Sequence, residues 1–420
     1  MKKTLLILGF LSIIGAAFSQ EKGIQFERTM NWEEIKADAK VKKKYIFLDL
    51  FATWCAPCKF MDDSVYNSEK LGTFMNEKFI SVRVQMDSTK KDDQYVKSWY
   101  KNLEGFKKDY KISSFPSFLF FNTAGELVHK STGASTDSLF INIAKSALNP
   151  DNQFYSRLKL YKEKRLKYHE MPALAKVAIS INEASEGNTI ASDYIENYLL
   201  KLPNEELFTK TNLEFIGDFL IKPEGDGFNL FLKNPELINA IMGDFYAQNK
   251  IMRSINRTYL PQNVEASKLA DWDELGRELK RKYGDLGEEI VWGQRMVYHF
   301  MSGNDWKEFG RCYENYFRRG LKRSLYEINN MSWAVLEHVN DPLILGFACD
   351  VVMKYALEKY FPNYANAYDT YANLLHKIGR TREAIKWQEQ AVKLKKGQPD
   401  EQTYLDVLAK MKKGEKTWVN

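Results

Sequence analysis

The sequence predicts two domains of different class: an α/β domain over residues 24–148, followed by an all-α helical-repeat domain over residues 154–418. Three observations lead to this prediction. In the first part, short apolar runs of strand length alternate with helical patterns. In the second part, apolar positions recur at helical spacing almost throughout, with breaks at glycine and proline residues such as Gly303 and Pro342. Near the C-terminus, matching residues such as Ala334 and Ala372 lie 38 positions apart, which is typical of stacked helical hairpins.

The composition is that of a soluble globular protein with more than one domain. The 420 residues exceed the usual size of a single domain, and 44% of them are hydrophobic and 28% charged. These values exclude a wholly disordered chain and a multispan membrane protein. A net charge of +6 over this length gives no reason to expect binding to nucleic acid or to a membrane surface. Four cysteines are too few for a fold held together by disulfides.

Residues 1–19 have the pattern of a secretory signal peptide. Lys2 and Lys3 are followed by an apolar run over residues 5–18, and small side chains precede the predicted cleavage after Ser19. The run is short for a membrane span and lacks a stop-transfer flank, so we expect no stable membrane span; an uncleaved anchor is the alternative. We therefore predict export, which in a Gram-negative bacterium means the periplasm.

Periodicity predicts the elements of the α/β domain in order. The segment 45–51 is a short apolar run, as expected of a buried strand, and the alternating segment 79–86 predicts another strand. Turn chemistry around Gly125 predicts a hairpin between the strands that flank it. The turn-forming residues 149–151 then mark a domain boundary. The complete predicted series is helix 32–40, strand 45–51, helix 55–61, strand 79–86, strand 117–121, strand 127–130 and helix 137–148.

The helical domain carries a repeat near its C-terminal end, most clearly over residues 325–395. Its last unit resembles a tetratricopeptide repeat, because small and aromatic residues fall at that family's positions: Tyr368, Ala372, Gly379, Ala384 and Ala391. Stacked helical hairpins present an extended surface that usually binds peptides or proteins. The repeats therefore predict a protein partner for this half of the chain.

The chemistry concentrates in the segment 54–59, which follows the strand 45–51 and opens a helix. Its two thiols, Cys55 and Cys58, are close enough across one helical turn to form a disulfide. Cys55 lies at the helix N-terminus, where free backbone N–H groups and the positive end of the dipole favour a thiolate. We therefore predict that Cys55 attacks a substrate disulfide and that Cys58 resolves the mixed disulfide. A zinc half-site is the alternative, but no second cysteine pair lies at ligand spacing.

The chain resembles the thioredoxin superfamily over residues 30–147. The segment 47–59 follows the family's strand-to-active-site pattern, Phe115–Pro116 matches its cis-proline loop, and Gly133 matches one of its later glycines. The segment around the cysteines is also similar to the C-terminal domain of the transmembrane disulfide reductase. The resemblance implies a thioredoxin-like fold and dithiol–disulfide exchange with disulfide-bearing protein substrates. It further implies a thiol electron donor and no cofactor.

The resemblance also assigns roles to residues around the two cysteines. Asp49 falls where thioredoxins place a buried carboxylate beneath the resolving cysteine, and it would accept the proton of Cys58. Arg83 falls at a strand position where the family carries a lysine. Pro116 is expected to be cis, which would let the backbone of Phe115 pair with a substrate strand. A purely structural role for Asp49 and an ordinary trans Pro116 are the alternatives.

Trp54, Ala56 and Pro57 surround Cys55 and are expected to form the rest of the substrate-binding surface. The Ala56–Pro57 dipeptide is similar to that of reducing thioredoxins, whereas oxidases usually carry a histidine before the second cysteine. We therefore predict a reductase. The family pattern is interrupted by a longer stretch over residues 88–114, which predicts an extra loop and helix near the site.

Two other functions remain open at this point. In the first, the helical half is the functional part and holds a protein partner. The thioredoxin-like domain is then accessory or redox-idle. The second is a dedicated role in cytochrome or metalloprotein maturation, which no residue pattern selects.

The remaining thiols and the histidines predict no metal site. Cys312 and Cys349 lie 37 positions apart, close to one repeat period. Equivalent helices pack about 8–10 Å apart, which is beyond the reach of a disulfide, so we predict two buried free thiols. The histidines show no ligand spacing: His129, His169, His299, His338 and His376.

Overall fold

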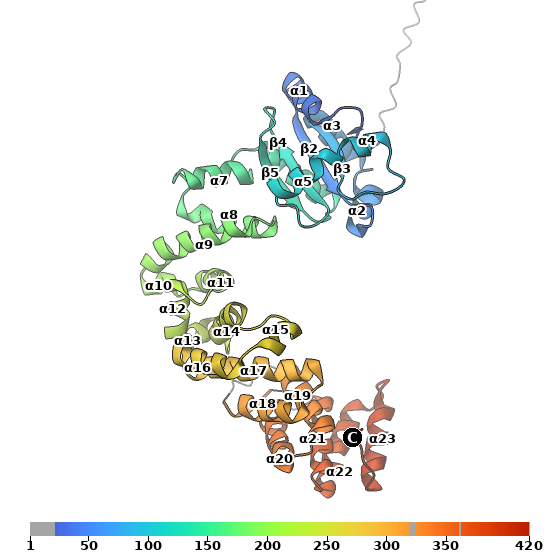
Figure 1. Cartoon of the computed structure of the whole chain (residues 1–420), viewed down its shortest axis with the longest axis vertical. Coiled ribbons are helices and arrows are strands. Elements are labelled where there is room, and N and C mark those ends of the chain that lie inside the picture. Colours follow the sequence, from blue (N-terminus) through green and yellow to red (C-terminus); the bar gives the residue numbers. More distant parts are fainter. Residues whose placement is uncertain (1–21, 320–324, 361–362, 420) are drawn as a thin grey trace, which may run out of the picture. The chain divides into compact units, whose positions relative to one another are not determined.

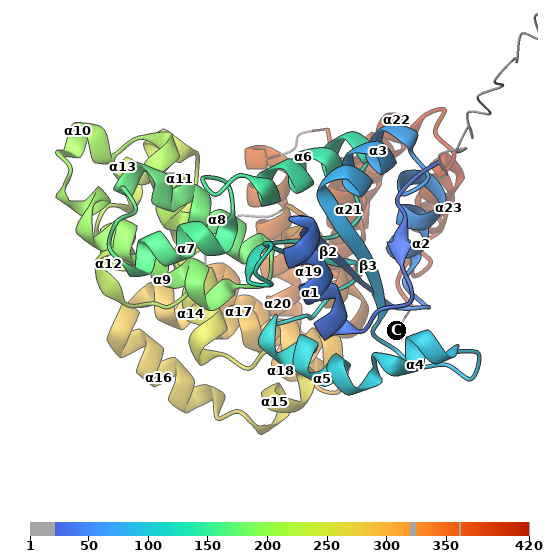
Figure 2. The ribbon, with the colours of Figure 1, turned by 90° about the horizontal axis from the view of Figure 1, so that it is seen from above.

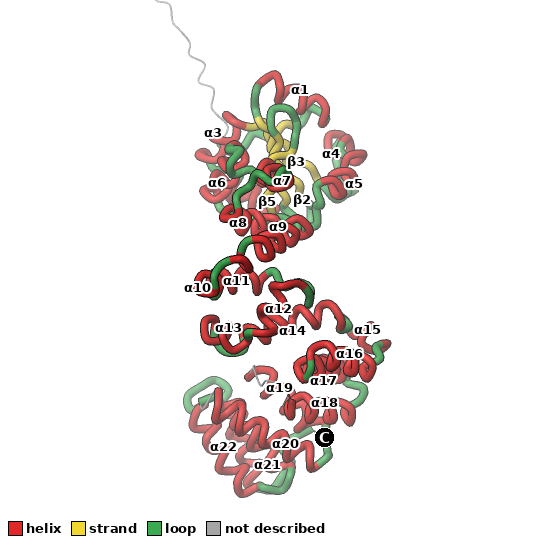
Figure 3. The backbone as a smooth tube through the Cα atoms, turned by 90° about the vertical axis from the view of Figure 1, so that its left-hand side faces the viewer, coloured by secondary structure: helices red, strands yellow, loops and turns green. Residues whose placement is uncertain are grey.

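The computed structural model describes residues 22–319, 325–360 and 363–419 (Figure 1). The predicted signal peptide over residues 1–19 lies outside the described residues. Contacts within the chain define two compact units, and the boundary between them in the sequence lies between Lys201 and Leu202. The first unit contains a mixed sheet with helices and the second is helical, so the predicted fold class is confirmed. In Figure 3 the strands are accordingly confined to the first unit.

The sheet of the first unit has five strands in the order β1-β3-β2-β4-β5. The strands are β1 Phe26–Glu27, β2 Tyr45–Phe51, β3 Phe79–Gln85, β4 Ser117–Phe121 and β5 Leu127–Thr132. β1 and β2 both run parallel to β3, whereas β4 runs antiparallel to β2 and to β5. β2 is therefore the central strand, hydrogen-bonded on both sides. β1 has only two residues and was not predicted, because so short a strand has no periodicity of its own.

The helices of the first unit follow the strands in the predicted order, with several additions. They are α1 Trp32–Lys42, α2 Ala56–Phe60, the π-helical turn η1 Met61–Val65, α3 Glu69–Lys78, α4 Gln94–Ser98, α5 Tyr100–Asp109, α6 Asp137–Leu148, α7 Phe154–Lys162, the short 3₁₀ turn η2 Tyr168–Glu170, α8 Met171–Ser180, α9 Ala184–Asn197 and the 3₁₀ turn η3 Leu199–Lys201. The predicted extra segment over residues 88–114 forms α4 and α5. It is part of the fold, because α5 contributes Leu103 and Phe106 to a buried cluster.

The central strand buries both of its faces because its side chains alternate between two cores. Ile46, Leu48 and Leu50 pack with α1 and α5 on one face. Phe47 packs with η1, α3 and α6 on the other. Figure 2 shows these helices on the two sides of the sheet. Asp49 lies between apolar neighbours on the Phe47 face, so a carboxylate points into the layer that carries α2 and η1.

The helices α7–α9 belong to the compact unit of the sheet, although the sequence predicts a boundary at residues 149–151. The reason is the free edge of β5, against which α7 packs (Figure 1). The backbone N–H of Phe154 donates to Nδ1 of His129 on β5 at 3.2 Å, and both residues are buried. Covering an edge strand in this way removes a site for unwanted strand pairing.

The second unit consists of helices that pack mainly against their neighbours in sequence. They are α10 Asn204–Leu207, α11 Lys210–Asp218, α12 Gly225–Lys233, α13 Pro235–Met242, α14 Tyr246–Tyr259, α15 Val264–Leu269, α16 Trp272–Tyr283, α17 Asp285–Ser302, α18 Trp306–Arg319, α19 Leu325–His338, α20 Pro342–Val351, the π-helical segment η4 Val352–Tyr360, α21 Ala365–Lys377, α22 Thr381–Lys395 and α23 Glu401–Lys412. Predicted breaks at Gly303 and Pro342 fall at helix ends. Gly303 ends α17 with φ +62°, a conformation that favours glycine. Among the described residues, no helix combines the length and the apolar character needed to cross a membrane.

The aromatic core between the sheet and α6 gives a direct test of this packing. Phe140 is fully buried, and its ring lies 4.9 Å from that of Phe118 and 5.4 Å from that of Phe47. Phe140→Ala should lower the free energy of unfolding of the first unit by about 3–5 kcal/mol, because it leaves a cavity. Leu139→Ala, at a neighbouring side chain that is 56% exposed, should change it by less than about 0.5 kcal/mol. Urea unfolding of the two variants measures both values, and equal losses would contradict this core.

Candidate active site

The two predicted cysteines lie where β2 ends and α2 begins. Cys55 is the N-cap of α2, and the backbone N–H of Cys58 donates to its Sγ at 3.2 Å. Ala56 and Pro57 occupy the first two helical positions, where a missing N–H costs no helical hydrogen bond. The two sulfurs are joined as a disulfide, with 5.3 Å between the Cα atoms. The placement at the helix N-terminus is the one that favours a thiolate on Cys55.

The disulfide is covered, and an exposed aromatic side chain marks its position on the surface. Cys55 and Cys58 are each only 2% exposed, so accessibility does not distinguish them in the oxidised state. Trp54, by contrast, is 71% exposed. Its ring meets that of Phe115 edge to face, at 6.0 Å between centroids. Trp54 and Phe115 thus form an aromatic pair beside the covered disulfide.

The loop before β4 has the geometry that the resemblance implied. The Phe115–Pro116 peptide bond is cis, and Pro116 is buried. Phe115 packs against the small buried cluster of Ala52, Cys55 and Cys58. Gly133, at φ +85°, donates its backbone N–H to the carbonyl of Pro116 at 2.9 Å. The positive φ explains why glycine occupies this position, and the bond fixes the loop to the end of β5.

A buried charge cluster lies on the sheet face that carries α2 and η1. Asp49 on β2 pairs with Arg83 at the facing position of β3, with 3.0 Å between Oδ2 and Nε. The same guanidinium binds Asp62 on η1 at 2.9 Å and stacks over the ring of Phe51 at 4.1 Å. Asp62 is four residues after Cys58 in the continuing helix, so the two residues share a helix face. Arg83 therefore connects the central strand to the helix of the resolving cysteine.

Burial sets the protonation of this cluster. It raises the pKa of Asp49 to about 6, although the positive charge of Arg83 opposes the shift. Burial also raises the pKa of Asp62, again against Arg83. The phenol of Tyr66, buried beside the same groups, has its pKa raised well above its ordinary value and stays neutral. Asp49 is thus a carboxylate that exchanges its proton near neutral pH, as a general base for Cys58 would need to do.

The part of the chain that forms this site is similar to known proteins. The family model described as "Thioredoxin-like domain" matches residues 32–147. Over 116 residues the chain is 31% identical to "Thioredoxin H-type" of Fagopyrum esculentum, a match that spans 28% of this chain and 84% of that protein. The chain belongs to the thioredoxin family.

Further relatives of this thioredoxin-like domain include disulfide-exchange proteins. "Thiol:disulfide interchange protein DsbD" of Vibrio cholerae is 28% identical over 128 residues, which span 29% of this chain and only 20% of that protein. A solved structure of a putative disulphide-isomerase from Bacteroides thetaiotaomicron is 25% identical. It aligns with a TM-score of 0.26, covering 31% of this chain and 98% of that chain. The matched residues of the family model end at 147, so the helical half takes no assignment from them.

The sequence located the cysteines, Asp49 and the cis-proline loop, but it missed Asp62 and Tyr66. Asp62 lies four residues after Cys58, and that spacing was the available indication. Arg83 was expected only as a weak counterpart of the family's lysine. The structure gives Arg83 a more central place, because it pairs with the buried carboxylate of Asp49 and with the partly exposed carboxylate of Asp62.

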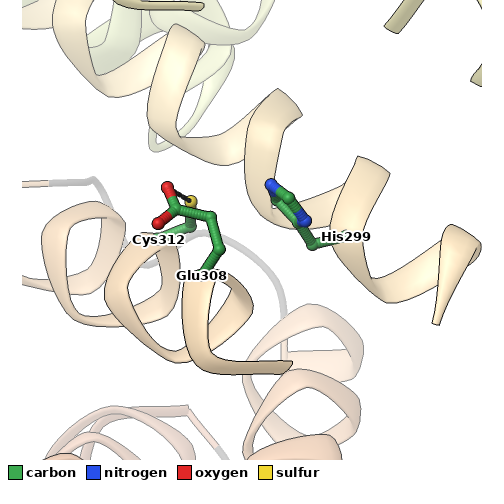
Figure 4. A group of neighbouring side chains, drawn as sticks. All are labelled: His299, Glu308 and Cys312. Atoms are coloured by element: carbon green, nitrogen blue, oxygen red, sulfur yellow. Dashed lines mark hydrogen bonds between the residues drawn. The ribbon is translucent and has the colours of Figure 1, made fainter. Parts of the chain in front are cut away.

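The other two thiols are free and buried, as predicted. The structure does bring one of the histidines close to one of them. Ligand atoms of His299, Glu308 and Cys312 lie within 4.8 Å of one another (Figure 4). Helix packing between α17 and α18 produces this proximity, which linear spacing did not reveal.

Ion pairs and one hydrogen bond of Glu308 account for the position of its carboxylate in this cluster. The Glu308 carboxylate accepts from Arg311 at 2.6 and 2.8 Å and pairs with Arg295 at 2.9 Å. The Cys312 thiol donates to the same carboxylate at 3.6 Å, and burial raises the pKa of this thiol. A cation would have to compete with two arginines for Glu308, so the contacts themselves give no reason to place a metal there.

The raised pKa of Asp49 predicts a pH dependence of stability. The folded state holds a proton on Asp49 up to about pH 6, whereas the unfolded state releases it near 3.8, so stability falls as pH rises through this interval. Asp49→Asn should remove this fall, which corresponds to about 3 kcal/mol. The variant should therefore gain stability relative to the wild type between pH 4 and pH 7 in urea unfolding experiments. Asp63→Asn, at an exposed neighbouring carboxylate, is the control. Parallel pH profiles for wild type and Asp49→Asn would contradict the shift.

Proposed function

We propose that this protein is an exported thiol–disulfide oxidoreductase that reduces disulfides in protein substrates. The observation that carries the proposal is the Cys55–Cys58 pair at a helix N-terminus, next to the cis-proline loop of a thioredoxin-like domain. The exchange itself needs no cofactor, because both electrons come from the two thiols.

The mechanism follows from the positions of the two sulfurs. In the reduced protein, the Cys55 thiolate attacks one sulfur of the substrate disulfide and forms a mixed disulfide, releasing the other sulfur as a thiolate that takes up a proton. Cys58 then attacks the sulfur of Cys55, which releases the reduced substrate and leaves the Cys55–Cys58 disulfide. Asp49 accepts the proton of Cys58 in this second step. A dithiol donor returns two electrons and two protons to the pair.

The substrate would be held by the surface around the cysteines. Trp54 and Phe115 supply an aromatic contact, and the backbone of Phe115 pairs with an extended substrate segment. Ala56 and Pro57 add a small apolar surface that leaves Cys55 approachable. The absence of a histidine before Cys58 favours the reducing direction.

Export is the second part of the proposal. The leader pattern over residues 1–19 supports this part, because it predicts cleavage after Ser19. In a Gram-negative host the protein would then work in the periplasm. N-terminal sequencing of the protein from a periplasmic extract tests this: Gln20 as the first residue supports export with cleavage, and a chain that keeps Met1 contradicts the cleavage and favours the uncleaved anchor.

A second candidate function is a protein-binding module in the helical half. The observation in its favour is a pocket of about 440 Å³ in the second unit, with a lining of mixed polar and apolar side chains. It is lined by residues of α19, α21 and α23, including Asn330, Trp333, Asn366 and Tyr404. Amide and aromatic side chains of this kind suit an extended peptide, which is consistent with the tetratricopeptide-like partner surface predicted from the sequence.

Cysteine variants test the oxidoreductase and separate it from the binding module. Cys55→Ser should lower the rate of insulin reduction by dithiothreitol by about a hundredfold or more, because the attacking thiolate is lost. Cys58→Ser should instead accumulate mixed disulfides with substrates, which non-reducing gels and mass spectrometry detect. Cys349→Ser, at a buried thiol outside the site, is the matched control and should behave as the wild type.

Full insulin reduction by Cys55→Ser would contradict the proposed reductase. Capture of the same partners by Cys55→Ser and wild type, with no mixed disulfide in Cys58→Ser, would favour the binding module instead.

A further inference from the structure

A lysine is fully buried on the edge strand of the sheet, outside the site described above. Lys130 lies on β5, and its side chain is 0% exposed. Its ammonium group donates to the carbonyl of Tyr110 at 2.7 Å and to that of Lys111 at 3.3 Å. Burial lowers its pKa to about 8, and Glu183 opposes this shift, so the group stays charged at neutral pH. The charged ammonium group therefore fixes the backbone of residues 110–111 through these two hydrogen bonds.

Glu183, in the turn between α8 and α9, completes this arrangement. Its side chain is 4% exposed and lies 3.9 Å from the ammonium of Lys130. One carboxylate oxygen pairs with the ammonium of Lys111 at 2.5 Å, and the other accepts from the hydroxyl of Tyr155 at 2.9 Å. A single buried carboxylate thus connects α7, the α8–α9 turn, β5 and the loop that follows α5.

The loop over residues 110–114, which these contacts fix, contains a residue in an unfavourable backbone conformation. Lys111 has φ +49°, in the left-handed region that side-chain-bearing residues rarely adopt. Both its carbonyl and its ammonium are bound by the cluster around Glu183. Three residues later, the hydroxyl of Ser114 accepts from the side-chain amide of Asn182 at 3.3 Å. The carbonyl of Ser114 accepts from the hydroxyl of Ser117 at 2.7 Å.

We propose that Asn182 and Glu183 are positioning residues, which hold the segment 110–114 so that the adjacent Phe115–Pro116 loop is ready to pair with a protein substrate. The inference rests on the proposed reductase function. In this proposal, the helices α7–α9 and the turn between α8 and α9 position the substrate-binding loop, in addition to covering β5.

The contacts predict which substrates are affected. The Phe115 backbone and side chain meet a protein substrate but do not take part in the sulfur exchange. Loosening the loop should therefore weaken the binding of an extended polypeptide disulfide more than that of a small disulfide without a backbone. A role limited to global stability would affect both kinds of substrate alike.

The experiment uses the full chain with two variants and one control. Glu183→Gln removes the charge from the cluster and keeps the shape. Asn182→Gly removes the bond to Ser114 and tolerates the φ of +63° at that position. Glu186→Gln is the matched control, because Glu186 on α9 pairs with Lys162 at 3.0 Å and acts on Lys111 only through its charge.

Two steady-state measurements are compared: reduction of insulin, and reduction of 5,5′-dithiobis(2-nitrobenzoic acid). The ratio of KM for insulin to KM for the small disulfide should rise at least about threefold in Glu183→Gln and Asn182→Gly, and stay at the wild-type value in Glu186→Gln. Amide hydrogen exchange should be faster at residues 110–117 in both variants, which reports on the loop without use of activity.

The proposal is overturned if either variant folds with the wild-type melting temperature and shows neither change. It is also overturned if the ratio rises equally in Glu186→Gln. A wild-type protein that reduces neither disulfide refutes the reductase itself, and with it the role of the loop. An active wild type with unchanged variants refutes only the positioning role, so the two failures are distinguishable.

Discussion

The buried ion pair between Asp49 and Arg83 is the interaction on which the site depends. β2 is hydrogen-bonded on both edges and covered on both faces, so a carboxylate in its middle carries a large desolvation cost. Arg83 offsets part of this cost from the neighbouring parallel strand. Its further contact with Asp62 ties the sheet to the helix that carries Cys58. Breaking the pair by removing only Arg83 would therefore disturb the placement of Cys58 as well as the charge balance of the core.

A partner also offsets the cost of a buried charge at one edge of the sheet, on β5. Lys130 is a second charged group taken out of water, and it is accommodated by two backbone carbonyls and by Glu183. Its partner comes from the helical segment that follows the sheet in sequence. The compact unit therefore extends to Lys201, well beyond the last residue matched by the thioredoxin-like family model at 147.

Several features of the fold could be predicted from the sequence because they arise from neighbouring residues. The strand Tyr45–Phe51 was predicted at its observed bounds, since a short run that is apolar except at Asp49 is typical of a strand buried on both faces. The cysteine spacing at a helix start located the pair that forms the disulfide, and the glycine at 303 located the end of α17. The unpredicted β1 is the opposite case, because its two residues form a strand only through pairing with β3.

The sequence by itself determined the α/β and all-α parts, the cysteine pair at a helix start and the carboxylate at Asp49, because local periodicity, helix capping and motif spacing encode them. Only the tertiary structure decided which charges meet. The partnership of Arg83 with Asp49 and Asp62, the burial of Lys130 against Glu183, and the proximity of His299 to Cys312 join residues from separate elements. Their physical basis is desolvation, which makes a buried charge depend on a partner that the packing of distant elements supplies.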